Sequence, residues 1–511
     1  MVDKIAIYTI IHQPRRLRLP AAPIDPQSSI DDIEQAIFDD ALNQYYFEKV
    51  ARYCYHPAVD LFSELVAGGL HFSVGITNSF IDQAIRWDPS LMEKVKALVS
   101  HPNVELVCVE PYHSFIFRID AQKFQERMKW ARRYLTRVFG KRPVVAETTE
   151  MFMSRQLYFI LEKLGFQATL AEGREMTLGW RSPTYLYQQC GKMGIFARHK
   201  DLSDDVGYRF SQKTWSGYPL TASQYAEWVR GTGGDLVFVG WDFETFGEHH
   251  NRETGIFEFL RWLPGELHYR GVQTVTLSEA LQKLKQKAYP VELPVYPTTW
   301  AGLNGDQRFF FGNAAQFQIL LLMHHAYNIA RLSGNPKLVD IALWLCQSDN
   351  LHLLQWHGSA DSSEAEVSSY FTPGYWWSLG AQRIPAELQR VYEHFIRCVA
   401  HRLGEQRPRW KATEEQMPIQ VKEQTQGKVV AFEIHAPDAE SVAVVGDFTG
   451  WNSTPVHLLP DDGGRWRGTV CLGPGVYEYK YLVDGRFLCD PSCHEVVPDG
   501  FGSANSVLTV E

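Results

Sequence analysis

Short apolar runs alternate with amphipathic segments along residues 1–285. The runs have the length and the Val and Ile content of buried β-strands. They are Ile5–Ile11, His71–Gly75, Val104–Val109, Pro143–Ala146, Ala168–Ala171, Gly194–Ala197, Leu236–Gly240 and Val272–Val275. Apolar residues recur at helical spacing in Asp82–Val99, Ala121–Val138 and Ser154–Leu164. Such strand–helix repeats predict a parallel sheet with right-handed crossovers, and this number of repeats favours a barrel. An open doubly wound sheet is the alternative, but the sequence lacks the glycine-rich phosphate loop that would support it.

The pattern changes twice in the second half of the chain. After the proline-spaced stretch Tyr289–Pro297, helical periodicity marks Gly312–Leu332, Pro336–Cys346 and Pro385–Leu403. From Val429 to Val510, short alternating strands are separated by Gly, Asp and Asn turns, which is typical of an immunoglobulin-sized β-sandwich. We therefore predict an α/β barrel over 1–290, a helical bundle packed against it over 291–405, a polar linker over 406–427, and an all-β sandwich over 428–511.

Composition narrows the class of protein. The chain has 511 residues, of which 45% are hydrophobic and 13% aromatic, and its net charge is −9. The basic residues are scattered, which argues against a nucleic-acid partner, and no apolar run has the length of a membrane span. The N-terminus lacks a signal-peptide pattern, and the eight cysteines include no CxxC pair. We expect reduced thiols and a cytoplasmic location; the sequence does not indicate an oligomeric state.

Polar side chains follow several of the predicted strands. His12 follows the first, Glu110 and His113 follow Val104–Val109, Glu147 and Glu150 follow Pro143–Ala146, and Asp242 follows Leu236–Gly240. A barrel brings the carboxyl ends of its strands to one face, so these groups should converge. Two converging carboxyl groups suit cleavage of a glycosidic bond, and in a retaining enzyme they lie roughly 5–5.5 Å apart.

Each of these residues also has a structural interpretation. His12 is as readily a structural hydrogen-bonding side chain as a site residue. Glu147 and Glu150 could favour the N-terminus of the helix that begins near Ser154. Asp242, Glu244 and Glu248 could be solvated loop charges.

A metal site at Glu248, His249 and His250 is a weaker interpretation. Adjacent histidines seldom point the same way, and the spacing is not that of a zinc-binding helix. We expect no metal and no cofactor.

The ordered motifs of residues 1–405 resemble glycoside hydrolase family 57, whose members act on α-glucans. His12-Gln13-Pro14 is similar to the family's opening motif, and Tyr112-His113-Ser114 to its second, without the usual glycine-containing lead-in. Thr148-Thr149-Glu150 matches the nucleophile motif, and Asp242–His249 matches Asp-Tyr-Glu-Thr-Phe-Gly-Glu-His. Ser348-Asp349-Asn350 resembles the fifth motif, although Leu351–His357 departs from the aromatic run usual there.

The resemblance implies an incomplete, seven-stranded (β/α) barrel closed by a helical bundle. It implies that Glu150 is the nucleophile and Asp242 the general acid/base. Glu147 competes for the nucleophile role, and the position after Thr favours Glu150. The side chains predicted to bind substrate are His12, Gln13, His113, Glu147, Glu244, His249, Trp300 and Asp349.

Residues 428–511 are similar to family 48 carbohydrate-binding modules, which include the glycogen-binding module of AMP-activated kinase β subunits. The resemblance rests on Val444–Asn452, Trp466, Gly475–Gly485, Asp490-Pro491 and Ala504-Asn505. It places Trp451, Lys480 and Asn505 at sugar-contacting positions, with Phe487 and Phe501 where the kinase module has Trp and Leu. An exposed ring can stack on a glucose face while Lys and Asn bind hydroxyl groups. In the alternative, the module is only a packing domain.

These features predict a retaining, α-amylase-like hydrolase of α-1,4 bonds in glycogen- or starch-type glucans. An α-glucan transferase, either a branching enzyme or a 4-α-glucanotransferase, would use the same covalent intermediate. A catalytically silent glycogen-binding scaffold and a metal-dependent polysaccharide deacetylase are further alternatives.

Overall fold

The computed structural model describes most of the chain in two compact units. The units are Met1–Arg409 and Trp410–Glu511. The described residues are 1–302, 304–355, 374–379, 383–406, 428–439, 441–449, 451, 455–461, 463–499 and 503–510. Most of the predicted linker, residues 407–427, lies outside them, as does Phe501.

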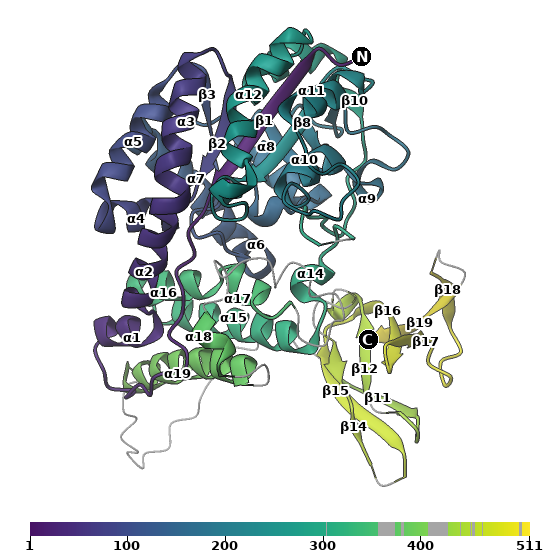
Figure 1. Cartoon of the computed structure of the whole chain (residues 1–511). Helices are drawn as coiled ribbons and strands as arrows, with labels where there is room; N and C mark the ends of the chain where they lie inside the picture. The colour runs from purple at the N-terminus through teal and green to yellow at the C-terminus, as the bar shows by residue number, and fades with distance from the viewer. Residues whose placement is uncertain are drawn as a thin grey trace. The chain divides into compact units, whose positions relative to one another are not determined.

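A curled parallel sheet forms the centre of the first unit (Figure 1). The strands run in the order β8–β1–β2–β3 and β4–β5–β7, and a parallel bridge between Cys108 and Ala146 joins the two sets. Their bounds are β1 Lys4–Ile11, β2 Phe72–Ile76, β3 Val104–Val107, β4 Val145–Ala146, β5 Ala168–Glu172, β7 Gly194–Arg198 and β8 Val237–Asp242. All residues of β7 and β8 are described, yet no ladder pairs them; the backbone N–H of His199 donates to Phe238. The predicted incomplete seven-stranded barrel is confirmed.

Further strands extend this sheet at its margins. β9 (Gln273–Val275) pairs with the first part of β1, close to the predicted Val272–Val275. β6 (Leu186–Gln188) runs antiparallel to β7, and β10 (Tyr289–Pro290) pairs with β6. The hydrophobic pattern did not predict β6 or β10, because strands of two or three residues show no periodicity.

Helices cover the outer face of the curled sheet. The predicted helices at Ala121–Val138 and Ser154–Leu164 are found as α7 (Ala121–Phe139) and α8 (Arg155–Lys163), the latter capped by Ser154. Other helices before residue 291 are α2 Asp40–Val50, α3 His56–Ala67, α6 Ile116–Ile119, α9 Glu175–Leu178, α10 Lys200–Gly207, α11 Ala222–Gly231, α12 Ile256–Tyr269 and α13 Leu277–Leu284. A further helix, α1 (Ile30–Ile37), packs instead against α16 (Pro336–Leu345) and α19 (Arg383–Gln406).

The prediction of a single helix over Asp82–Val99 is wrong, because the segment contains two helices. The segment forms α4 (Asn78–Trp87) and α5 (Pro89–Ser100). Asp88 lies between them with non-helical backbone angles, and its carboxylate accepts the N–H of Leu91. Pro89 explains the break: proline disfavours a helical residue before it and is favoured in the first turn of a helix.

Alternation along β1 separates two hydrophobic clusters. Ala6, Tyr8 and Ile10 face the inside of the curled sheet, whereas Ile7 and Ile11 pack against the helices. The hydroxyl of Tyr8 therefore lies in the interior of the curled sheet, where it reaches Glu147 just past the end of β4. This position matters for the site described below.

The helical region after residue 291 is bound to the barrel through its loops. Its helices are α14 Arg308–Phe311, α15 Ala314–Leu332, α16 Pro336–Leu345, α17 Asp349–His352, α18 Gly374–Trp377 and α19 Arg383–Gln406. Antiparallel bridges join Ser114 to Gln347 and Met153 to Thr298. Two loops of this region are thereby fixed against the loops that follow β3 and β4.

The second unit is an antiparallel β-sandwich, as predicted. One sheet has the order β11–β15–β14 and the other β13–β12–β16–β19–β18, with β17 beside β16. The bounds are β11 Lys428–His435, β12 Val442–Gly446, β13 Val456–His457, β14 Leu459–Pro460, β15 Arg465–Leu472, β16 Gly475–Val483, β17 Arg486–Leu488, β18 Val496–Pro498 and β19 Ala504–Val510. The core between the sheets includes Phe432, Val444, Trp466 and Tyr481.

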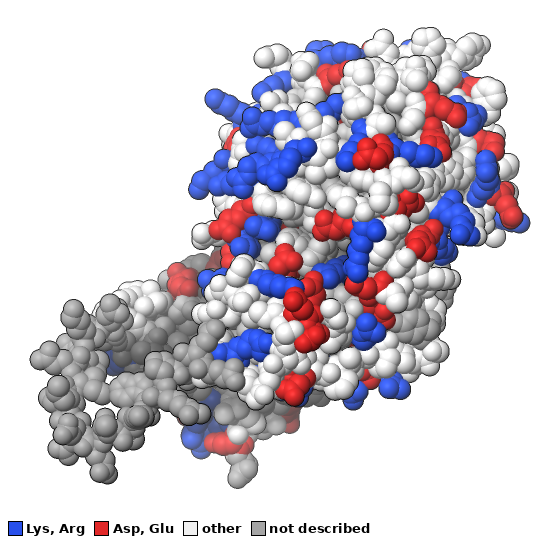
Figure 2. All heavy atoms as spheres, turned by 90° about the vertical axis from the view of Figure 1, so that its left-hand side faces the viewer, with Lys and Arg blue, Asp and Glu red and all other residues white. Residues whose placement is uncertain are grey.

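Two further features of the structure are the distribution of charge on its surface and the apolar content of its helices. The face shown in Figure 2 carries basic and acidic side chains in an interleaved pattern. None of the helices in the described part of the chain combines the length and the apolar content that a membrane crossing requires.

Candidate active site

Loops at the carboxyl ends of the parallel strands assemble the site. β1 ends just before His12, β4 ends four residues before Glu150, and Asp242 is the last residue of β8. Asp349 begins α17 of the helical region. The barrel therefore brings His12 and Asp349, 337 positions apart in sequence, to one place.

Glu150 is held by two hydrogen-bond donors. The indole Nε1–H of Trp300 donates to its Oε2 at 3.0 Å, and the hydroxyl of Ser348 donates to its Oε1 at 3.0 Å. Its backbone φ is +56°, a left-handed value that is strained for a residue other than glycine. The hydroxyl of Thr299 binds the Glu150 carbonyl at 2.6 Å and supports this conformation. Such strained residues concentrate at functional sites.

Burial raises the pKa of both central carboxyl groups. For Glu150 burial and the nearby Asp242 charge raise the pKa to about 8, although the hydrogen bond from Trp300 opposes the shift. For Asp242 burial raises the pKa to about 6, against the positive charge of Arg198. Because the Asp242 charge acts on Glu150, the two groups are electrostatic neighbours. Both can hold a proton near neutral pH.

Glu147 lies beneath this pair, on the side of the barrel interior. Its side chain is buried, and its Oε2 accepts a short hydrogen bond from the hydroxyl of Tyr8. Burial, with the charges of Glu150 and Asp242, raises its pKa to about 8. The Tyr8 hydroxyl would lie 2.3 Å from a Cβ on residue 75, so glycine at that position makes room for it. Glu147 is therefore part of the floor of the site.

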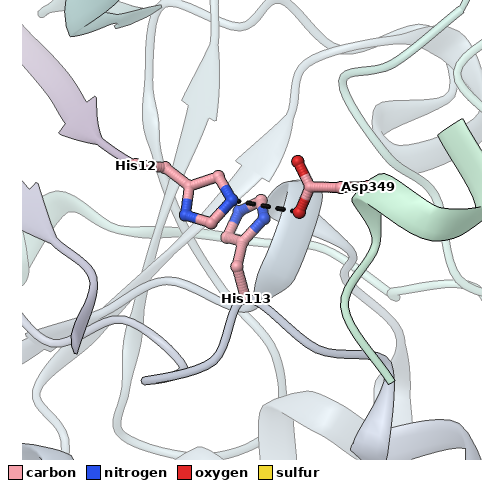
Figure 3. A group of neighbouring side chains, drawn as sticks. All are labelled: His12, His113 and Asp349. Atoms are coloured by element: carbon pink, nitrogen blue, oxygen red, sulfur yellow. Dashed lines mark hydrogen bonds and ion pairs between the residues drawn. The ribbon is translucent and has the colours of Figure 1, made fainter. Parts of the chain in front are cut away.

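His12, His113 and Asp349 form a cluster beside Glu150 (Figure 3). The two imidazole rings are stacked with their centroids 4.2 Å apart. Nε2 of His12 lies 3.1 Å from Oδ2 of Asp349, and a ring nitrogen of His113 lies 3.7 Å from Oε1 of Glu150. Burial opposes ionisation of Asp349, but the charge and hydrogen bond of His12 outweigh it and lower its pKa to about 2. The cluster therefore places three polar side chains next to the carboxyl groups of Glu150 and Asp242.

Gln13 and Glu244 lie close to His12 and share one hydrogen-bonding partner, Tyr55. The hydroxyl of Tyr55, from the π-helical segment Ala51–Tyr55, lies 2.6 Å from Oε1 of Glu244 and 3.0 Å from Oε1 of Gln13. Burial raises the pKa of Glu244 well above its usual range. His249 is joined to the same turn, because its N–H donates to the Glu244 carbonyl. These side chains support the loops that carry His12 and Asp242.

Arg198 and Glu172 are site residues that the sequence analysis missed. Arg198 ends β7 and donates to the Gly240 carbonyl at 3.0 Å, two residues before Asp242. It also forms ion pairs with the buried Glu172, at the end of β5, and with Asp204. The sequence could have pointed to both, because Arg198 and Glu172 are charged residues directly after predicted strands, as Glu110 is.

In the loop that follows Asp242, Glu248 and His250 contact different partners and do not form a cluster. Glu248 forms an ion pair with Lys49 at 2.7 Å, and the ring of His250 binds the hydroxyl of Ser211 and the carbonyl of Gly207. Among the described residues, the group that could hold a metal ion is instead His12, His113 and Asp349.

The sugar-contacting positions predicted in the second unit differ in exposure. Phe487 is 47% exposed, and Trp451 is half-buried with its indole N–H donating to Asp447. Lys480 and Asn505 are buried: Lys480 binds Asp499 at 2.5 Å and Asn505 donates to Glu478 at 2.8 Å. The two aromatic rings are more accessible than the two polar side chains.

Comparison with known proteins identifies relatives of both units. A model of glycosyl hydrolase family 57 matches residues 6–294, and a model of the glycogen recognition site of AMP-activated protein kinase matches residues 430–511. A Methanocaldococcus jannaschii protein named "Putative alpha-amylase" is 33% identical over 372 residues, 71% of this chain and 79% of that protein.

Two solved structures share the fold of the first unit. A family 57 branching enzyme from Thermococcus kodakaraensis has a TM-score of 0.50 and 14% identity, covering 77% of this chain and 95% of that one. A family 57-type branching enzyme from Pyrococcus horikoshii has a TM-score of 0.52 and 14% identity, covering 78% and 96%. At this identity the similarity concerns the fold alone.

Proposed function

The chain belongs to glycosyl hydrolase family 57, and on that premise we propose that it is a retaining, α-amylase-like hydrolase of α-1,4-glucans. The single observation that carries the proposal is the pair Glu150 and Asp242, two carboxyl groups with raised pKa values at the carboxyl end of the barrel. Double displacement needs one carboxylate to attack the anomeric carbon and one carboxylic acid to protonate the leaving oxygen.

The hydrogen bonds of the pair support the assignment of roles. Glu150 faces two donors, Trp300 and Ser348, which stabilise a carboxylate. Among the described residues no hydrogen bond is made to the Asp242 side chain, so this carboxyl group can exchange a proton with the glycosidic oxygen. Glu150 is therefore the nucleophile, and Asp242 protonates the leaving group and then activates water. In the free site Glu150 has the higher pKa, about 8 compared with about 6 for Asp242, so a single proton would be held by Glu150. The proposed mechanism requires the reverse once the sugar is bound, with the proton on Asp242 and the negative charge on Glu150.

The surrounding side chains suit a sugar ring. His12, His113 and Asp349 offer hydrogen-bonding atoms beside Glu150, and the Trp300 ring is partly exposed. An aromatic face and a few polar groups are the usual composition of a carbohydrate pocket. Gln13, Glu147, Glu244 and His249 act on substrate through the groups that they position.

Substitution of either carboxyl group tests the mechanism. We expect Glu150→Ala and Asp242→Asn each to reduce kcat on amylose by at least about a thousandfold, because each removes a required step. Glu248→Gln, a change in the same loop as Asp242, is the matched control and should retain most activity. Near-normal activity in either site variant, with a native circular dichroism spectrum, would refute the assignment.

The fate of the glycosyl-enzyme distinguishes hydrolysis from transfer. Incubation with amylose should release new reducing ends. Redistributed chain lengths without new ends would indicate a transferase, for which the family 57 branching enzymes provide a precedent in fold. A wild-type protein that neither cleaves nor rearranges amylose but binds glycogen would be a catalytically silent glycogen-binding scaffold.

The second unit is proposed to bind glycogen-type glucan through Trp451 and Phe487. Lys480 and Asn505 would then hold the shape of the surface, since each is paired within the unit. We also propose a cytoplasmic location, supported by the free thiols of the seven cysteines whose side chains are described.

A further inference from the structure

In the histidine–aspartate cluster beside Glu150, Nδ1 of each imidazole faces a hydroxyl group. The Ser348 hydroxyl donates to Glu150, so its oxygen accepts the Nδ1–H of His113 at 2.9 Å. The Thr77 hydroxyl donates to the Ile11 carbonyl, so its oxygen accepts the Nδ1–H of His12 at 3.1 Å. With Glu150 ionised, hydrogen therefore occupies Nδ1 of both rings, and Nε2 is the nitrogen left to bind a proton or a cation.

The Nε2 atoms of the two rings differ in their partners. Nε2 of His12 lies 3.1 Å from Oδ2 of Asp349. Nε2 of His113 is buried and has no hydrogen-bond partner in the described part of the structure. A proton on Nε2 of His12 pairs that ring with Asp349, whereas a buried polar atom left unpaired, as Nε2 of His113 is, is costly. A metal cation in place of that proton would bind both Nε2 atoms and the Asp349 carboxylate.

We propose that His12, His113 and Asp349 form a binding site for a divalent transition-metal cation of the Zn²⁺ class. Two imidazole nitrogens and one carboxylate oxygen are a ligand set typical of Zn²⁺, Co²⁺ or Ni²⁺ and not of Ca²⁺ or Mg²⁺. A metal-binding histidine usually donates its other ring N–H to an oxygen acceptor that fixes the ring; here the Thr77 and Ser348 hydroxyl oxygens take that position.

The dimensions of the cluster agree with this ligand set. One candidate ligand atom from each residue lies within 4.8 Å of the others. Coordination at about 2.0–2.2 Å would bring the atoms to roughly 3.4 Å from one another, which needs side-chain movements of about 1 Å. Three protein ligands also leave a coordination position open on the side of the substrate pocket.

The cation would be an inhibitor, because it would occupy atoms that a sugar needs. This second part of the proposal depends on the function proposed above, in which the same three side chains contact the glucan. Zn²⁺ should therefore raise the KM for maltoheptaose and leave kcat unchanged, and a chelator should restore the original KM.

Co²⁺ titration of the untagged full chain tests the site independently of activity. We expect one visible absorption band of four- or five-coordinate Co²⁺ per chain, displaced by Zn²⁺ and not by Mg²⁺. His113→Ala and the nearly isosteric Asp349→Asn should weaken Co²⁺ binding roughly 10- to 100-fold or more. His71→Ala is the matched control, since that histidine pairs with Glu279 at the start of β2 and not at the site.

The results separate the two proposals. Absence of the band, or a band of equal strength in both site variants with native circular dichroism, would overturn the cation site. Binding of Co²⁺ with non-competitive inhibition by Zn²⁺ would overturn the shared site. A chain that binds Co²⁺ but cleaves no glucan would leave the cation site standing and contradict only the proposed hydrolase.

Discussion

At the scale of single residues, the site combines buried carboxyl groups with strained backbone. Glu150 and His113 both have positive φ values, and Glu147, Glu150 and Asp242 all have raised pKa values. Each feature costs folding free energy. Such costs are expected where reactive groups must be kept in one geometry and away from water.

The raised pKa of Glu150 predicts how its substitution changes stability with pH. In the unfolded chain the group titrates near its ordinary 4.5, and in the folded chain near 8. Below 4.5 it is protonated in both states; as pH rises to 8 the folded state progressively loses stability relative to the unfolded state. Glu150→Gln should therefore raise Tm by several degrees at pH 8.5 and by little at pH 4.5.

Thermal unfolding measured across this pH range checks the prediction. Glu258→Gln, on the exposed face of α12, is the control for loss of one negative charge. A Tm difference between Glu150→Gln and wild type that is equal at both pH values would contradict it.

At the scale of elements, neighbouring strands share the space inside the barrel. Tyr8 of β1 points to the interior beside Gly75 of β2, and a Cβ on that glycine would also lie 2.7 Å from Cγ1 of Val109. The close approach allows the Tyr8 hydroxyl to reach Glu147. The packing of two strands thus positions the floor of the site.

Gly75→Ala tests this packing. We expect a loss of about 1–3 kcal/mol in the free energy of unfolding, from overpacking, together with reduced kcat. Tyr8→Phe in the same chain should recover part of the stability, because the clashing hydroxyl is removed. Gly231→Ala, where a Cβ meets nothing within 4 Å, should be nearly neutral in urea unfolding. Equal effects of the two alanine substitutions would argue against a packed interior at Tyr8.

At the scale of the whole molecule, the chain joins a family 57 unit to a unit that resembles a glycogen recognition site. Their contributions can be separated by substrate. Under the proposed function, a long, branched glucan binds to both units, whereas a short oligosaccharide binds only to the catalytic unit. Linked binding groups raise apparent affinity for a polymer without changing the chemistry.

Trp451→Ala tests that division of labour. Glycogen co-sedimentation should weaken roughly 3- to 10-fold, the effect of losing one stacked ring. Cleavage of maltoheptaose should keep its wild-type kcat and KM. Trp262→Ala, an exposed ring on α12 of the other unit, is the control. Unchanged co-sedimentation after Trp451→Ala would exclude a binding role for that ring.

The sequence alone determined the family, the succession of the main parallel strands, and the face on which polar groups would gather. These follow from local information: hydrophobic period identifies the elements, and the motifs of His12-Gln13-Pro14 and Asp242–His249 are contiguous. The same information misjudged the break at Asp88 and overlooked Arg198, a charged strand terminus like those it used.

Only the tertiary structure decided what each side chain contacts. It directs Glu147 to Tyr8, brings Ser348 and Trp300 to Glu150, and pairs Lys480 and Asn505 within their own unit. The physical reason is that these partners come from elements far apart along the chain. A side chain's direction and burial depend on such packing, and no local pattern encodes them.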